Sequence, residues 1–218
     1  MNASPIRCLI TAGPTREYFD PVRFISNPSS GKMGYALAAA ARDAGWRVDL
    51  VSGPVALPAP EGVEVVPVVT GREMLAAVQE LFPLCNILIK VAAVCDMRPK
   101  RRFPDKVKKD ELALTVEFEP VEDILKTVAA GKQPGQIVIG FAAETQNVEA
   151  YARRKLAEKK LDWIVANRVG GARSAFESDR NDVLLIGSDG EKLAFGPGAK
   201  TDIAHQLIGY LNAYHFVH

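Results

Sequence analysis

The segment Gly13–Gly34 is the part of this sequence with the most evident means of binding an anion. It combines arginines, serines and glycines with Asn27, and it leads into an Ala-rich helical stretch that starts near Gly31. The first N–H groups of a helix have no partner inside the helix and can bind an anion. A strand and a helix are usually joined by roughly 2–6 residues, and a connection far longer than that is typical of a functional loop. The alternative is a surface loop that ends in a serine N-cap.

Three later segments also carry polar residues next to predicted strands. Asp96 follows small residues that let a ligand approach the backbone, although such an aspartate can also cap a turn. The basic run Lys100–Lys109 is either a solvated face or a mobile flap that clamps phosphates. Phe141 is either a core residue or an aromatic side chain that stacks on a base.

Several kinds of site are excluded or weakened by the residues present. The three histidines lie near the C-terminal end, which argues against a histidine-dependent triad or a histidine-ligated metal. The GxGxxG fingerprint is absent, and Lys32 is followed by methionine, which does not fit a Walker A motif. Tyr151 and Lys155 have the YxxxK spacing of short-chain dehydrogenases, so a nicotinamide-dependent oxidoreductase remains an alternative.

The composition is that of an ordinary globular protein. The 218 residues are 48% hydrophobic and 24% charged, with a net charge of +1. This balance argues against a nucleic-acid partner or a membrane partner. Cys8, Cys85 and Cys95 have no CxxC spacing and are expected to be reduced thiols. With neither a leader pattern nor a long apolar run, we expect a cytoplasmic protein.

Apolar strands that alternate with helical stretches must position these side chains. Continuous apolar strands of this kind predict a doubly wound, mostly parallel α/β sheet in a single domain over residues 1–218. The chain also contains a basic flap around 98–110, an extra strand at 112–118 and a hairpin at 183–195, which we expect to add a ribbon or an oligomer contact. The strands are expected at 7–12, 47–52, 63–68, 87–93, 136–142 and 162–166, and the helices at 31–45, 70–81 and 148–160.

In combination, these segments resemble the phosphopantothenoylcysteine synthetase family, in its stand-alone bacterial form. The resemblance extends from about Leu9 to Asp189. It is carried by ordered motifs: Thr15-Arg16-Glu17, Asp20–Asn27, Ser29–Gly34, Ala92-Ala93-Val94 with Asp96, Lys106–Lys109, Gly140–Thr145 and Asp162–Asn167.

The resemblance implies a ligase that joins 4′-phosphopantothenate to cysteine in coenzyme A biosynthesis. A nucleoside triphosphate, usually CTP in bacteria, activates the carboxylate as an acyl-nucleotide, and Mg²⁺ shields the triphosphate. The resemblance also implies a homodimer without FMN, whose product passes to a separate flavin-dependent decarboxylase. A non-catalytic nucleotide-binding homologue is a further alternative.

The resemblance also implies roles for individual residues. Asn27 would bind the carbonyl of the acyl intermediate, with Ala92 close to it, and Lys106 would neutralise the triphosphate during activation. Asn27 and Lys106 are therefore the expected catalytic residues, and no metal ligand is identified. The expected nucleotide-binding residues are Lys90, Val91, Ala92, Asp96, Lys106, Val121, Glu122, Asp123, Ile124, Leu125, Phe141, Lys155 and Lys159.

Overall fold

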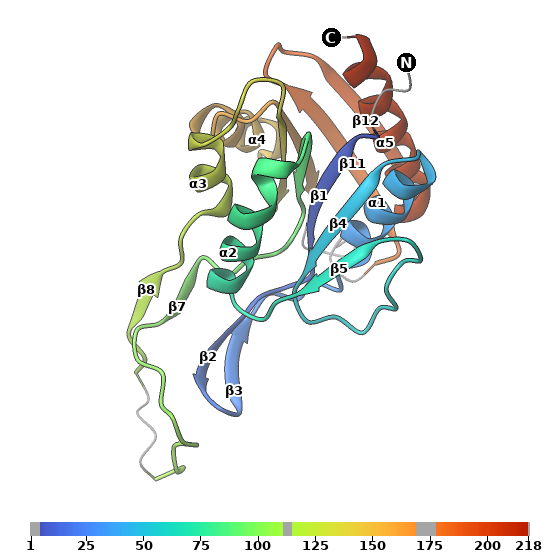
Figure 1. Cartoon of the computed structure of the whole chain (residues 1–218). Helices are drawn as coiled ribbons and strands as arrows, with labels where there is room; N and C mark the ends of the chain where they lie inside the picture. Colours follow the sequence, from blue (N-terminus) through green and yellow to red (C-terminus); the bar gives the residue numbers. More distant parts are fainter. Residues whose placement is uncertain (1–4, 111–114, 169–177, 218) are drawn as a thin grey trace.

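A twisted eight-stranded sheet forms the centre of the protein (Figure 1). The computed structural model describes residues 5–110, 115–168 and 178–217. The strand order is β12-β11-β10-β9-β6-β1-β4-β5. The six strands from β5 to β10 in this order are parallel, whereas β11 and β12 are antiparallel. The bounds are β1 (Arg7–Ala12), β4 (Arg47–Ser52), β5 (Glu64–Pro67), β6 (Ile87–Lys90), β9 (Ile137–Glu144), β10 (Trp163–Arg168), β11 (Arg180–Gly187) and β12 (Lys192–Ala199).

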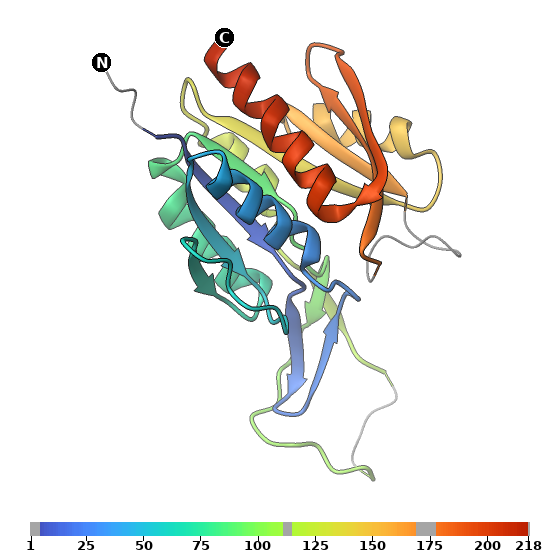
Figure 2. The same ribbon diagram turned by 90° about the vertical axis from the view of Figure 1, so that its right-hand side faces the viewer.

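Helices cover both faces of the sheet, as Figures 1 and 2 show. Side chains of α1 and α5 share one core cluster with the sheet, and those of α2, α3 and α4 share the other. Neighbouring residues Leu9 and Ile10 of β1 are both fully buried, one in each cluster. This arrangement confirms the doubly wound, mostly parallel sheet. The helices are α1 (Lys32–Asp43), α2 (Gly71–Leu81), α3 (Ile124–Ala130), α4 (Val148–Glu158) and α5 (Lys200–Val217), with a short 3-10 helix, η1 (Phe82–Leu84), after α2.

The order in which the parallel strands are added to the sheet reverses at β1. The chain places β4 and β5 on one side of β1, and then places β6, β9 and β10 on the other. The carboxyl ends of β1 and β6 therefore flank a crevice where open α/β sheets bind their ligands.

Two small ribbons extend from this end of the sheet (Figures 1 and 2). β2 (Arg16–Asp20) and β3 (Arg23–Ser26) form a hairpin inside the connection that we expected to be a loop. β7 (Met97–Pro99) pairs with β8 (Phe118–Pro120). We call β2, β3 and residues 97–110 and 115–120 the arm.

The extra strand predicted at 112–118 is wrong in its position. Residues 115–117 are not a strand, and the strand of this region runs over Phe118–Pro120. The alternation of Leu112, Leu114, Val116 and Phe118 predicted this strand, and Leu112 and Leu114 lie outside the described residues. Alternating apolar residues indicate an extended chain but not its partner, and only Phe118–Pro120 lies opposite β7. The hairpin predicted at 183–195 is confirmed and is longer at both ends, as β11 and β12.

Within the described part of the chain, no helix combines the length and apolar character needed to cross a membrane.

Candidate active site

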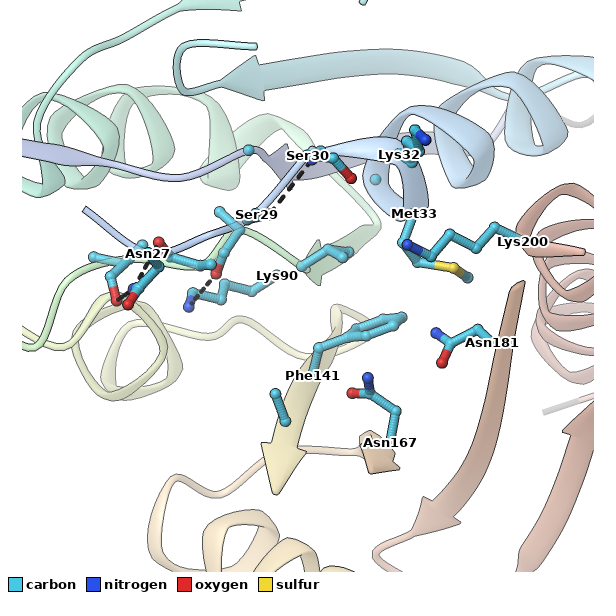
Figure 3. Close-up of a pocket in the computed structure, with 18 of the residues that line it drawn as sticks. Asn27, Ser29, Ser30, Lys32, Met33, Lys90, Phe141, Asn167, Asn181 and Lys200 are labelled. Carbon is cyan, nitrogen blue, oxygen red and sulfur yellow. Dashed lines mark hydrogen bonds between the residues drawn. The ribbon is translucent and has the colours of Figure 1, made fainter. Parts of the chain in front are cut away.

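A cavity of about 310 Å³ lies at the carboxyl ends of the central strands (Figure 3). It is bounded by the α1 N-terminus and by residues at the ends of β1, β6, β9 and β10. Its lining residues are Gly13, Asn27, Ser29, Ser30, Gly31, Lys32, Met33, Gly34, Lys90, Val91, Ala92, Ala93, Val94, Asp96, Phe141, Ala143, Lys155, Asn167, Asn181 and Lys200.

Glycines bring the α1 N-terminus close to β1 and leave it open to the cavity. A Cβ atom on Gly34 would lie 2.5 Å from the Cβ of Ala12, so only glycine allows this approach. Gly31, the N-cap of α1, has a φ of 76°, a left-handed conformation that favours glycine. The N–H groups of the first helical turn therefore border the cavity, where they can bind an anion.

The side-chain amide of Asn27 connects the loop after β3 to the loop after β6. Its Nδ2 donates hydrogen bonds to the carbonyl oxygens of Ala93 and Val94, at 3.1 Å each. Next to it, the hydroxyl of Ser26 donates to the carbonyl oxygen of Thr15 at 2.8 Å. These contacts fix Asn27 at one end of the cavity.

Three lysines, two of which are paired with carboxylates, line or border the cavity. Lys155 forms an ion pair with Glu144 at 2.7 Å, and Lys159 forms one with Asp123 at 2.7 Å. The Lys90 ammonium donates to the carbonyl oxygen of Ala92 at 2.8 Å. Burial and the positive charge of Lys159 lower the pKa of Lys90 to about 8. An anion in the cavity would offset both effects and keep Lys90 charged.

A second polar group lies at the opposite end of the cavity. Figure 3 shows Lys200 and Asn181 on the far side of Phe141 from Asn27. Lys200 is only 5% exposed, and burial together with the charge of Lys32 lowers its pKa. Lys32 in turn forms an ion pair with Asp179 at 2.6 Å. The cavity thus has cationic groups at both ends.

Seven of the predicted site residues line this cavity. They are Asn27, Lys90, Val91, Ala92, Asp96, Phe141 and Lys155. Asp123 and Lys159 do not line it, but their charges act on Lys90. Half of the fourteen residues that the family resemblance suggested therefore line one cavity, and the charges of Asp123 and Lys159 act on it.

The segment Val121–Leu125, expected to bind the nucleotide, leads into α3. Asp123 is the N-cap of α3, and its carboxylate accepts a hydrogen bond from the N–H of Lys126 at 3.1 Å. The side chains of Ile124 and Leu125 are buried in the core, so only their backbone groups are available to a ligand. Val121 and Glu122 do not line the cavity either.

Lys106 is exposed and does not line the cavity. Its segment packs on the β2–β3 hairpin instead. The N–H of Val107 donates to the Asp20 carboxylate at 3.3 Å, and the Arg23 guanidinium donates to the carbonyl oxygen of Val107 at 2.8 Å. The expected role of Lys106 stays a prediction.

The oxidoreductase alternative finds little support in this geometry. Lys155 lines the cavity, but Tyr151 does not. The guanidinium of Arg154 lies 5.2 Å from the centroid of the Tyr151 ring. The YxxxK spacing therefore does not place both side chains in one site.

Lys200, Asn181, Asn167 and Lys32 were not predicted as site residues. Asn167 and Lys32 lie within motifs of the resemblance, whereas Asn181 and Lys200 lie outside them and reach the cavity through the antiparallel strands at the sheet edge. The available signals were the motif Ser29–Gly34 for Lys32 and the polar end of a strand for Asn167. Nothing local marks Lys200 as buried.

Comparisons with known proteins give sequence relatives that match more than nine-tenths of this chain. The bifunctional coenzyme A biosynthesis protein CoaBC of Bacillus subtilis is 47% identical over 201 residues, which are 92% of this chain and 49% of that protein. The CoaBC protein of Escherichia coli K12 is 48% identical over 208 residues, which are 93% and 50% of the two chains. The chain therefore spans about half the length of the curated relatives it matches.

Solved structures share the fold over nearly the whole chain. The C-terminal domain of a CoaBC protein is 42% identical, with a TM-score of 0.83 over 98% of this chain and 97% of that one. A structure of Cab2 bound to phosphopantothenate-cysteine has a TM-score of 0.80 over 97% of this chain and 87% of that one. At 16% identity, it supports the fold alone.

The family described as the DNA/pantothenate metabolism flavoprotein C-terminal domain (DFP) matches residues 4–214. Since this match covers almost the whole chain and the relatives above are nearly half identical, the chain belongs to this family, as its motifs predicted.

Proposed function

We propose that this chain is a ligase that joins 4′-phosphopantothenate to cysteine at the expense of CTP. The observation that supports it most is a single cavity with cationic groups at both ends and an amide, Asn27, held at its rim. Such a cavity suits two anionic substrates, a triphosphate and a phosphorylated acid. The sequence relatives are named as coenzyme A biosynthesis proteins, and Cab2 was solved with phosphopantothenate-cysteine.

The reaction has two steps. The carboxylate of 4′-phosphopantothenate attacks the α-phosphorus of CTP, and pyrophosphate leaves. The amine of cysteine then attacks the acyl carbon, and CMP leaves with the electron pair of the broken C–O bond. Oriented donors and positive charges catalyse such steps by stabilising the charge that develops on oxygen. Lys90, Lys155 and the α1 N-terminus supply these groups along the cavity.

We also propose that Mg²⁺ arrives bound to the triphosphate. Within the described residues, no three His, Cys, Asp or Glu side chains are grouped so as to hold a metal ion. Asp123 and Glu144 are engaged with lysines, whereas Asp96 lines the cavity without an ion pair among the described residues. Mg²⁺ is commonly bound by one or two carboxylates together with substrate phosphates, and Asp96 fits this role.

Pyrophosphate release tests the proposed activity. With CTP and Mg²⁺, we expect release that requires 4′-phosphopantothenate, and CMP release that additionally requires cysteine. We expect CTP to give a higher kcat/KM than ATP, because backbone groups around Lys90–Ala92 can recognise a pyrimidine. Binding of CTP without turnover would instead indicate a non-catalytic nucleotide-binding homologue. Hydride transfer from a nicotinamide cofactor would support the oxidoreductase alternative. A higher kcat/KM with ATP would contradict the nucleotide preference alone.

We propose that the arm joins two copies of the chain as a homodimer. Val22, Phe24 and Ile25 of the hairpin are 55%, 42% and 39% exposed, and Met97 and Phe118 of the adjoining ribbon are 50% and 42% exposed. Apolar side chains clustered on projecting strands are typical of an interface.

Light scattering should give the mass of a dimer at micromolar concentration, and Ile25→Lys should reduce it to that of a monomer. Leu84→Lys is the matched control, because Leu84 is also exposed, at 57%, but lies in η1 outside the arm. A monomeric wild type, or equal effects of the two substitutions, would show that the arm is not an interface.

A further inference from the structure

We propose that the side-chain ammonium of Lys90 binds the α-phosphate of the nucleotide, and that the side chain takes up a proton from solvent when the nucleotide binds. This inference rests on the proposed function and deepens it. The family resemblance places Lys90 among the nucleotide-binding residues without a role for its side chain.

Lys90 is the last residue of β6, and its side chain lines the cavity. The three residues before it in β6 are buried in the core. Thr11 and Gly140 lie opposite Lys90 on the neighbouring strands β1 and β9, and neither brings a charge to it. Figure 3 shows the Lys90 ammonium on the same side of Phe141 as Asn27. The end of β6 thus presents a cationic group to this side of the cavity.

The Lys90 ammonium has more N–H donors than partners. A lysine ammonium carries three N–H groups. One of them donates to the carbonyl oxygen of Ala92 at 2.8 Å. Lys90 forms no ion pair, with Asp96 or with another carboxylate, among the described residues. Because Lys90 lines the cavity, its other N–H groups are available to a ligand there, and an anionic oxygen is the acceptor that suits a desolvated ammonium best.

The charged groups around Lys90 do not compensate for its burial. They come from α3, from α4 and from the loop after β6, and they are Asp123, Lys155, Lys159 and Asp96. Asp123 is engaged with Lys159, and Lys155 is engaged with Glu144, at 2.7 Å each. Burial, together with the positive charge of Lys159, lowers the pKa of Lys90 to about 8. Near pH 8, a large fraction of the side chain is therefore neutral before a ligand binds.

The α-phosphate is the anion that the proposed reaction brings to this position. The resemblance places Asn27 and Ala92 beside the acyl intermediate, and the Lys90 ammonium donates to Ala92. In that intermediate, a single oxygen joins the acyl carbon to the α-phosphorus. The 4′-phosphate is at the opposite end of its substrate from the carboxylate, and the β- and γ-phosphates leave as pyrophosphate. The α-phosphate is therefore the phosphate that stays near Lys90 in both steps.

Binding of this phosphate changes the charge of Lys90. A phosphate oxygen next to the ammonium favours the charged form and raises the pKa from about 8 towards the ordinary lysine value of about 10.4. Each site should then take up about 0.7 proton at pH 8.5 but only about 0.1 proton at pH 7. The proton comes from solvent and remains on Nζ. The positive charge is thus in place when the carboxylate attacks the α-phosphorus.

Calorimetric titration of CMP into the nucleotide-free enzyme measures this uptake without turnover. The heat of binding is compared in two buffers that differ in their enthalpy of ionisation, and the difference gives the number of protons exchanged. We expect about 0.7 proton per site at pH 8.5, and a Kd about tenfold higher at pH 9 than at pH 7. CTP with Mg²⁺ should give the same uptake. Cytidine, which has no phosphate, should give none.

Two variants assign the proton to Lys90. Lys90→Met removes the ammonium but fills a similar length, and we expect no uptake and a Kd that does not change between pH 7 and pH 9. Lys90→Gln should behave in the same way, although its amide can still donate to the carbonyl oxygen of Ala92. Lys155→Met is the matched control, because Lys155 also lines the cavity but is paired with Glu144. It should weaken binding and keep most of the uptake.

Nucleotide binding without proton uptake by the wild type, uptake that persists in both Lys90 variants, or equal uptake with cytidine would overturn the inference and leave the proposed ligase activity intact. Uptake on binding of 4′-phosphopantothenate alone would assign Lys90 to that substrate and would also overturn it. A wild-type enzyme that binds neither CMP nor CTP would instead overturn the proposed function, and the inference with it.

Discussion

Replacing Lys106 by alanine is expected to lower the rate of acyl-nucleotide formation by about 10²–10³-fold, the usual cost of removing one group that stabilises developing charge. Pyrophosphate departure concentrates negative charge on the triphosphate, and the ammonium of Lys106 would neutralise it. Pyrophosphate release in a single turnover measures this step. Lys109→Ala is the matched control, because Lys109 is exposed in the same segment and has no expected role. Near-normal release by Lys106→Ala would remove Lys106 from the mechanism.

The position of Lys106 makes a second measurement informative. Lys106 does not line the cavity of its own chain, and the neighbouring Val107 is tied to Asp20 and Arg23 of the hairpin. To act on the triphosphate, the lysine must therefore either move to its own cavity or reach the cavity of a second copy.

A mixture of two inactive variants distinguishes these cases. In an equal mixture of Lys106→Ala and Asn27→Ala chains, half of the dimers contain one chain of each kind. If Lys106 serves the partner, one of the two sites in each mixed dimer is complete, and about a quarter of the wild-type activity returns. If it serves its own cavity, no activity returns.

The parts of the fold that depend on local patterns were predictable from the sequence. Thr70 and Glu73 have the spacing of a capping box, and α2 begins there. The Thr70 hydroxyl accepts from the N–H of Glu73 at 3.2 Å, while the Glu73 carboxylate accepts from the N–H of Val69 at 2.8 Å. Likewise, the mostly apolar residues of β1 marked a strand buried on both faces. In these cases, the interacting residues are close together along the chain.

The β2–β3 hairpin also had a local signal, but a weaker one. Asp20 begins the turn, and its Oδ1 accepts from the N–H groups of Val22 and Arg23 at 2.9 Å each. Aspartate bonded in this way to the backbone two residues on is typical of an Asx turn. The segment Asp20–Arg23 was interpreted as part of a functional loop because its residue types are those of a binding segment.

The arm and the far end of the cavity could not be predicted, because they depend on distant contacts. Met97–Pro99 pairs with Phe118–Pro120 across a long intervening segment, and nothing in either tripeptide specifies the other. Lys200 reaches the cavity only because β11 and β12 return along the sheet edge and place the start of α5 there. Both arrangements follow from how the whole sheet is assembled.

Replacing Gly34 by alanine is expected to reduce both stability and activity. The added Cβ would lie 2.5 Å from the Cβ and 3.1 Å from the Cα of Ala12. Since Ala12 belongs to the buried β1, neither atom can rotate away, and the start of α1 must move from the sheet. Overpacking of this kind typically lowers the free energy of unfolding by about 1–3 kcal/mol. The same movement displaces Ser29–Gly31, which line the cavity, and a misplacement near 1 Å costs about 10²-fold in rate.

Gly209→Ala is the control for this substitution. Gly209 is exposed in α5, and a Cβ there would meet no atom within 4 Å. Alanine in a helix interior is more favourable than glycine by about 0.5–1 kcal/mol, so this variant should be at least as stable as the wild type. Urea denaturation and pyrophosphate release measure the two quantities for both variants. Because α1 carries the N–H groups that border the cavity, Gly34→Ala should also weaken CTP binding, which Gly209→Ala should leave unchanged. A Gly34→Ala enzyme with wild-type stability and turnover would show that the close approach of α1 to β1 does not hold the site in place.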